Sequence, residues 1–67
     1  MNQKIEQAIN NQIKEEISSA YIYLGMAAYC EGQNLKGFAN WFMVQTKEEM
    51  DHAMGLYKFM FDRGGGK

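Results

Sequence analysis

The hydrophobic and polar positions in the first half of this chain recur with the period of an α-helix. From about residue 2 to residue 31, one face of the predicted helix repeats in alternating steps of four and three. That face comprises Ile9, Ile13, Glu16, Ala20, Tyr23, Ala27 and Cys30. Such a stripe is typical of a helix in a bundle. Glu16 stands in it where an apolar residue is expected.

The same period returns from about residue 35 to residue 62. This second face comprises Phe38, Phe42, Gln45, Glu49, His52, Leu56 and Phe59. Between the two helices, residues 32–34 break the pattern, with Gly32 expected as a left-handed stop and Asn34 as the cap of the next helix. A connection this short joins antiparallel neighbours. The sequence therefore predicts one all-α domain, an antiparallel two-helix hairpin with a loose glycine-rich tail at residues 63–67.

Glu49 and His52 are three residues apart, so they lie on one side of the second helix, one turn apart. The midpoint between Glu16 and either of them falls inside the predicted turn, which places Glu16 opposite the pair when the hairpin closes. No Lys or Arg of either stripe lies at this height, and burying carboxylates without a counter-charge is costly. We therefore expect a divalent metal of the iron, manganese or zinc kind. The alternative, that one helix is rotated and the carboxylates face water, stays open.

Composition points to a partner for the hairpin. The chain has 67 residues, of which 46% are hydrophobic, and its one Cys allows no internal disulfide. A unit of this size buries too little apolar surface to be secure alone, so the simplest partner is a second copy. A second hairpin related by a two-fold axis would supply another Glu16, Glu49 and His52. The six side chains together are enough to bind two metal ions. Four carboxylates would balance two ferrous ions, and oxygen-rich ligation suits iron or manganese better than zinc.

The charge balance excludes other classes of partner. A net charge of −1 predicts no attraction to nucleic acid or to an anionic membrane surface. The apolar runs are far too short to span a membrane. A single Cys without a recognisable targeting segment is expected in a reducing cytoplasm.

Three segments carry a family resemblance. Residues 16–24, 34–42 and 45–54 resemble the first two helices of prokaryotic non-haem ferritins, and residues 62–65 look like the start of their connection to a third helix. The resemblance covers essentially the whole chain. It implies binding of ferrous iron, its oxidation at a di-iron ferroxidase centre by dioxygen or peroxide, and storage or detoxification of the product.

The resemblance also assigns roles to individual residues. Glu16 matches the ligand of the first helix, Glu49 the bridging carboxylate and His52 the imidazole ligand. Tyr23 matches a tyrosine beside the centre that is thought to supply an electron to oxygen, although a core tyrosine would occupy the same place. Glu48 matches a carboxylate of a third iron site in some bacterial members, although its place beside the stripe, and not on it, favours a solvent-exposed side chain.

The chain departs from the ferritin pattern because it has no third or fourth helix. Either it is a fragment, or two or more copies assemble a four-helix bundle that binds two irons per pair of hairpins, with zinc or manganese as substitutes. The leading interpretation is a ferroxidase-type oxidoreductase. The alternative is a metal-binding or structural helical module, a ferritin fragment, without turnover.

Overall fold

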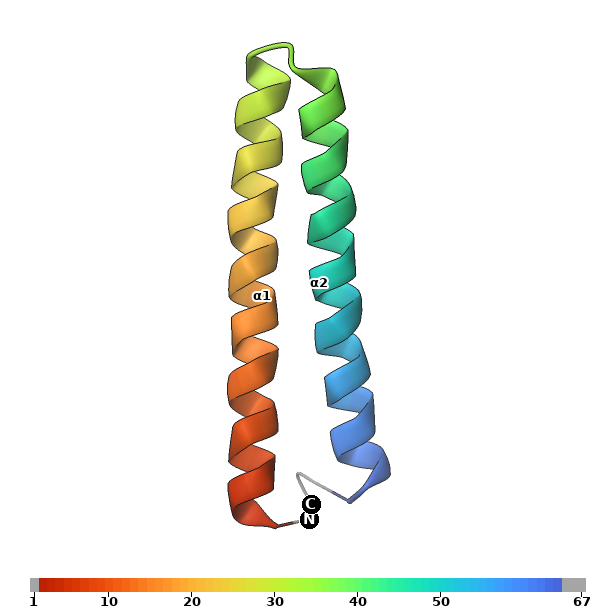
Figure 1. The fold of residues 1–67 in the computed structure, drawn as a ribbon. Coiled ribbons are helices and arrows are strands. Elements are labelled where there is room, and N and C mark those ends of the chain that lie inside the picture. The colour runs from red at the N-terminus through yellow and green to blue at the C-terminus, as the bar shows by residue number, and fades with distance from the viewer. Residues whose placement is uncertain (1, 65–67) are drawn as a thin grey trace.

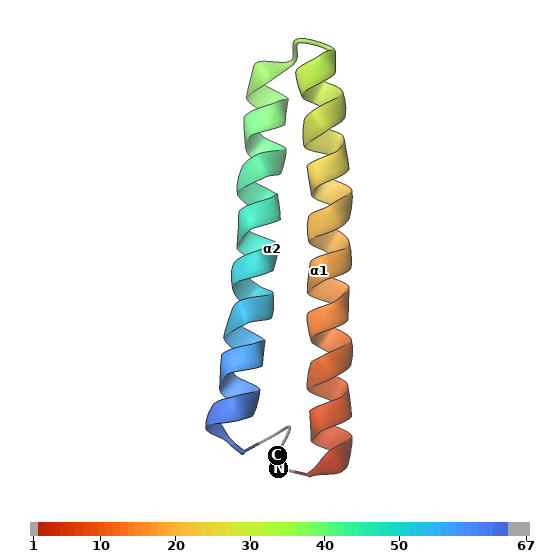
Figure 2. The ribbon, with the colours of Figure 1, turned by 180° about the vertical axis from the view of Figure 1, so that it is seen from behind.

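The computed structural model describes residues 2–64, which form a hairpin of two long antiparallel helices (Figure 1). Helix α1 spans Gln3–Gly32 and helix α2 spans Lys36–Asp62. The molecule measures 47 × 16 × 12 Å, and the helices run alongside each other from the turn to the open end in both views (Figure 2). No strand occurs within residues 2–64. The predicted all-α two-helix hairpin is thus confirmed.

The start of α1 is capped as expected. The side-chain oxygen of Asn2 accepts hydrogen bonds from the backbone N–H groups of Lys4 and Ile5, at 2.7 and 3.4 Å. These contacts satisfy two of the N–H groups that a helix leaves unpaired at its start. The first turn is therefore fixed by the residue that the sequence indicated.

The turn differs from the prediction by one residue: residues 33–35, and not 32–34, connect the helices. Gly32 still belongs to α1, and the left-handed residue is Asn34, with a φ of 61°. The N-cap of α2 is Leu35, which makes no side-chain capping bond. The expected roles of Gly32 and Asn34 are therefore wrong. Because α1 continues through Gly32, Asn34 takes the positive φ that asparagine tolerates and no longer occupies the capping position.

At the other end, Arg63 caps α2 and Gly64 takes a φ of 81°. A positive φ suits glycine and stops the helix there. Residues 65–67 of the predicted tail lie outside the described residues.

Small side chains dominate the contact between the helices. The most buried side chains are Ala20, Ala27, Cys30, Ala39, Ala53 and Met60. All seven residues of the predicted α1 stripe are at least half-buried, so that face is confirmed. Alanines at the contact let the two backbones approach closely.

The predicted face of α2 is rotated by about one residue at its two ends. Phe38 and Phe59 are 64% and 46% exposed, whereas Ala39, Ala53 and Met60 turn toward α1. At each end the neighbour one position later faces α1, whereas Phe42, Gln45, Glu49 and Leu56 of the predicted face are half-buried as expected. The bulky apolar side chains are left on the open faces of the hairpin.

Candidate metal centre

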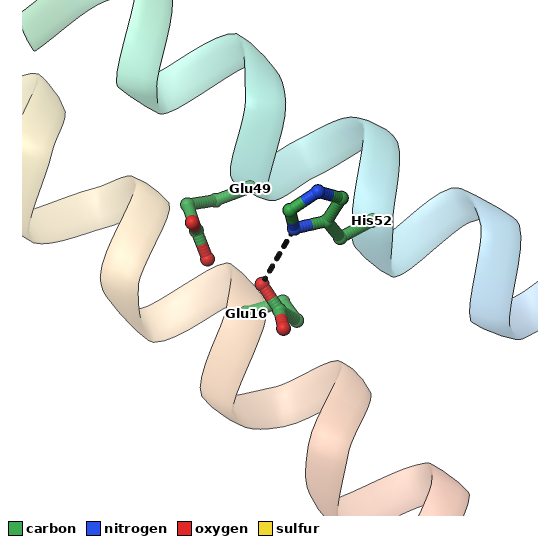
Figure 3. A group of neighbouring side chains, drawn as sticks. All are labelled: Glu16, Glu49 and His52. Atoms are coloured by element: carbon green, nitrogen blue, oxygen red, sulfur yellow. Dashed lines mark ion pairs between the residues drawn. The ribbon is translucent and has the colours of Figure 1, made fainter.

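The predicted ligands Glu16, Glu49 and His52 come together halfway along the hairpin. Glu16 projects from α1, while Glu49 and His52 project from consecutive turns of α2 toward it (Figure 3). One ligand atom from each residue lies within 4.8 Å of the other two. The Oε2 atom of Glu16 is 3.4 Å from Nδ1 of His52. Two carboxylates and one imidazole therefore surround a single small volume, as the spacing along the chain indicated.

The two oxygens of Glu16 differ in their surroundings. Its side chain is only 15% exposed, and Gln12 Nε2 donates a hydrogen bond of 3.0 Å to Oε1. The other oxygen, Oε2, is buried and accepts no hydrogen bond within residues 2–64, and Nδ1 of His52 approaches it only to 3.4 Å. A buried carboxylate oxygen that accepts no hydrogen bond is costly. A cation beside Oε2 would remove that cost, so the group fits a divalent metal.

Gln12 was not singled out from the sequence. It lies one turn before Glu16 on the same side of α1, and side chains four residues apart on a helix are neighbours. That spacing is the signal that would have found it. Its amide fixes one oxygen of Glu16, so it orients the carboxylate from outside the ligand set.

The two glutamates influence each other's protonation. A hydrogen bond with Glu16 raises the pKa of Glu49, and burial and the Glu16 charge act in the same direction. The same hydrogen bond from Glu49 lowers the pKa of Glu16, helped by Gln12 and His52. Glu49 is therefore the carboxyl group of the pair that gives up its proton less readily, and Glu16 the one that gives it up more readily. A metal ion beside the two groups would favour the charged form of both.

The imidazole of His52 leaves the group accessible. Its side chain is 60% exposed, and the ring nitrogen that does not face Glu16 points away from the carboxylates (Figure 3). One side of the three-residue group is thus uncovered by the hairpin. A metal held there would keep positions for further ligands.

The other two predicted site residues lie apart from this group. Glu48 is exposed and does not join the three ligands. Tyr23 is half-buried, two turns from Glu16. Its ring is perpendicular to that of Trp41 and tilted by 32° from that of Phe42, with centroids 6.5 and 6.2 Å away. Their roles in iron chemistry stay predictions. Within residues 2–64, neither helix is long and apolar enough to cross a membrane.

Comparison with known proteins bears on this centre. The Ferritin-like domain family matches residues 6–66. The bacterial non-heme ferritin of Staphylococcus aureus (strain USA300) is 39% identical over 64 residues, and that of Bacteroides fragilis (strain 638R) is 40% identical over 65. These alignments cover 96% and 97% of this chain but 39% and 41% of the relatives, so the chain spans about two fifths of their length.

Solved structures give the same result. An open pore ferritin from the hyperthermophilic archaeon Archaeoglobus fulgidus superposes with a TM-score of 0.92 at 49% identity, covering 97% of this chain and 40% of that one. A humanized archaeal ferritin superposes with a TM-score of 0.94, also at 49% identity, over 97% of this chain and 39% of its own. The sequence match, the superposition and the hairpin with its Glu and Glu-x-x-His side chains agree. This chain belongs to the ferritin-like domain family.

Proposed function

We propose that this hairpin binds ferrous iron through Glu16, Glu49 and His52 and promotes its oxidation at a di-iron centre completed by a second hairpin. The observation that carries the proposal is the convergence of three ligand atoms within 4.8 Å of one another, with the buried Oε2 of Glu16 accepting no hydrogen bond within residues 2–64. Two such groups offer four carboxylates and two imidazoles. A Glu from each of two helices and a Glu-x-x-His from each of two others is the ligand set of ferritin-like di-iron bundles.

The protein's own residues would bind the ferrous ions, orient the ligands and neutralise the positive charge. Four carboxylates balance the charge of two ferrous ions, and Gln12 keeps Glu16 turned toward the centre. Because the pKa of Glu49 is raised, binding of the metal would favour loss of the Glu49 proton, since metal ligands must be deprotonated. Iron is the substrate: each ferrous ion gives up one electron, and two electrons with two protons reduce one dioxygen to hydrogen peroxide. Peroxide is the alternative oxidant. Manganese and zinc are expected to bind as substitutes.

Two further roles belong to this proposal. Tyr23, half-buried above Glu16, would supply an electron to the oxidant. Glu48, beside Glu49 and exposed, would help to bind a third iron at the edge of the centre. Both assignments rest on the ferritin family, and the relatives' names support iron storage as the wider purpose.

The test is oxygen consumption after anaerobic loading with ferrous iron. The unaltered chain is expected to consume oxygen, and Glu49→Ala is expected to lose both iron binding and oxygen uptake. Glu15→Ala is the matched control, because Glu15 is an exposed neighbour of Glu16 outside the group. Oxygen uptake by Glu49→Ala at the rate of the control would contradict the assignment.

A second candidate is a metal-binding structural module without turnover. The position of the group favours it, because a cation held by Glu16 of α1 and by Glu49 and His52 of α2 would tie the two helices together. In that case metal would raise the thermal stability of the protein, while oxygen consumption stayed at background and zinc bound as strongly as iron.

A further inference from the structure

Two aromatic side chains of opposite helices are in ring contact on the turn side of the metal group. The ring of Tyr23 in α1 is perpendicular to that of Trp41 in α2, with centroids 6.5 Å apart. Phe42 packs against both, with its centroid 6.2 Å from that of Tyr23 and 5.1 Å from that of Trp41. These separations lie in the range of roughly 4.5–7 Å at which aromatic rings pack. We call Tyr23 and Trp41 the aromatic pair.

The members of the aromatic pair share a chemistry that Phe42 lacks. A phenol and an indole each give up one electron far more readily than a phenyl ring, and each carries a proton, on O–H or N–H, that can leave with it. Trp41 is the single Trp of the chain. Within residues 2–64, Tyr23 is the tyrosine whose ring packs against it. One phenol and one indole are therefore placed to exchange an electron and a proton.

The two members lie at different places relative to the metal group. Tyr23 follows Glu16 by two turns on the same stripe of α1, about 10 Å along the helix. Trp41 lies outside the α2 stripe that carries Glu49 and is 53% exposed, whereas Tyr23 is half-buried. An electron that leaves Tyr23 toward the centre can therefore be replaced through Trp41. The ring contact belongs to the hairpin itself and does not depend on a partner.

We propose that Trp41 restores Tyr23 after Tyr23 has supplied an electron to the oxidant. This role rests on the proposed function, in which Tyr23 supplies that electron. It assigns to Trp41 a part in the reaction that neither its place on the helix nor its hydrophobicity indicates.

The exchange balances in three steps. Tyr23 gives one electron and its phenolic proton to the dioxygen or peroxide that oxidises the iron. Trp41 then gives one electron and its indole proton to Tyr23, so that the O–H bond of Tyr23 re-forms as the N–H bond of Trp41 breaks. A ferrous ion from solution supplies one electron and becomes ferric, and water supplies the proton that restores the indole.

The indole of Trp41 need not lose an electron more readily than the phenol of Tyr23. The exchange between the two rings is reversible, and the ferrous ion removes the oxidised indole as it forms. That removal draws the exchange from Tyr23 toward Trp41. Phe42 takes no electron, and its contacts with both rings hold them at the distance that the exchange requires.

The first test uses the metal-free protein and does not depend on iron oxidation. Azide radicals generated by pulse radiolysis oxidise the indole of Trp41, and its absorbance is expected to decay as that of a phenoxyl radical grows, at a rate independent of protein concentration. Tyr23→Phe should remove this phase. Tyr57→Phe is the matched control and should keep it, because the ring of Tyr57 packs against Phe61 instead. Persistence of the phase in Tyr23→Phe, or a rate that rises with protein concentration, would overturn the aromatic pair.

The second test follows the radical during iron oxidation by freeze-quench EPR, after oxygen is mixed with protein loaded anaerobically with ferrous iron. Trp41→Phe keeps an aromatic ring at the contact but removes the electron and proton donor, so the phenoxyl radical of Tyr23 should persist several-fold longer than in the unaltered chain. Thermal unfolding of the metal-free variant reports separately on any loss of packing.

The outcomes separate the role of Trp41 from the proposed function. A phenoxyl radical of unchanged lifetime in Trp41→Phe would overturn the role of Trp41, even if iron is oxidised at the full rate. Absence of iron oxidation by the unaltered chain would overturn the proposed function, and with it the role of the aromatic pair in that reaction, even where the metal-free exchange is observed.

Discussion

Gln12 offers a sharp test of the centre because it supports a ligand without belonging to the ligand group. Its Nε2 donates a 3.0 Å hydrogen bond to Glu16 Oε1 from one turn earlier in α1. Gln12→Ala removes that bond and frees the carboxylate to rotate away from Glu49 and His52. Partners that orient metal ligands change metal affinity by about 10- to 100-fold. Since Gln12 is exposed, water replaces part of its contact, and we expect a loss of about tenfold.

The fold itself should not suffer from this change. Alanine is a slightly better helix former than glutamine, and Gln12 is exposed, so the free energy of unfolding of the metal-free protein should stay the same or rise slightly. The loss of affinity and the unchanged stability together separate an effect on the centre from a general loss of structure.

The assay is calorimetric titration under anaerobic conditions with ferrous iron, repeated with Mn²⁺ as a probe that does not react with oxygen. Asn11→Ala is the matched control. Asn11 is next to Gln12 and is also exposed, but it lines a hollow with Lys14 and Glu15 that does not include the three ligands. Equal affinity of Gln12→Ala and the unaltered chain, or an equal loss in Asn11→Ala, would refute this account of Glu16.

Three further predictions concern stability. Asn2→Ala should lower the free energy of unfolding by about 0.5–1 kcal/mol in urea denaturation, because it removes the cap of α1. Ala27→Leu should cost about 1–3 kcal/mol in the same assay, because Ala27 is 3% exposed where the helices approach closely; unchanged stability would contradict that packing. The raised pKa of Glu49 predicts that metal-free stability falls as pH rises through its titration, above the ordinary 4.5; Glu49→Gln should remove this fall, and its persistence would refute the assignment.

The pH prediction has an opposing contribution. The lowered pKa of Glu16 gives stability that is present above the ordinary value and is lost as pH falls. The two effects occupy different windows, one above and one below the usual carboxyl range. The fall in the stability of the metal-free protein at higher pH therefore reports on Glu49. The loss of stability at lower pH reports on Glu16.

Much of the fold and the geometry of the three-residue group follows from the sequence. The α1 stripe and the convergence of Glu16 with Glu49 and His52 depend only on helical period and on the position of the turn. Both quantities are local properties of the chain. The observed turn lies one residue later than predicted, which shifts the helices by only about 1.5 Å along their axes and leaves the pairing intact.

The face of α2 could not be read in the same way. This helix carries apolar residues on more than one side, and periodicity weights bulky residues such as Phe38 and Phe59. The contact with α1 instead selects Ala39 and Ala53 by size. The hydrophobic pattern does not encode which of two neighbouring apolar residues faces α1, as at Phe59 and the buried Met60. The pattern did not indicate Gln12, because this residue lies outside the stripe and acts through a hydrogen bond to Glu16.

The central claim is that two hairpins share a centre for two ferrous ions. Native mass spectrometry of the chain, loaded anaerobically with ferrous iron, tests it most directly. The account predicts a dimer that carries two irons, or a larger assembly with two irons for each pair of hairpins, and a dimer of Glu49→Ala without metal. A monomer that retains no iron would contradict it.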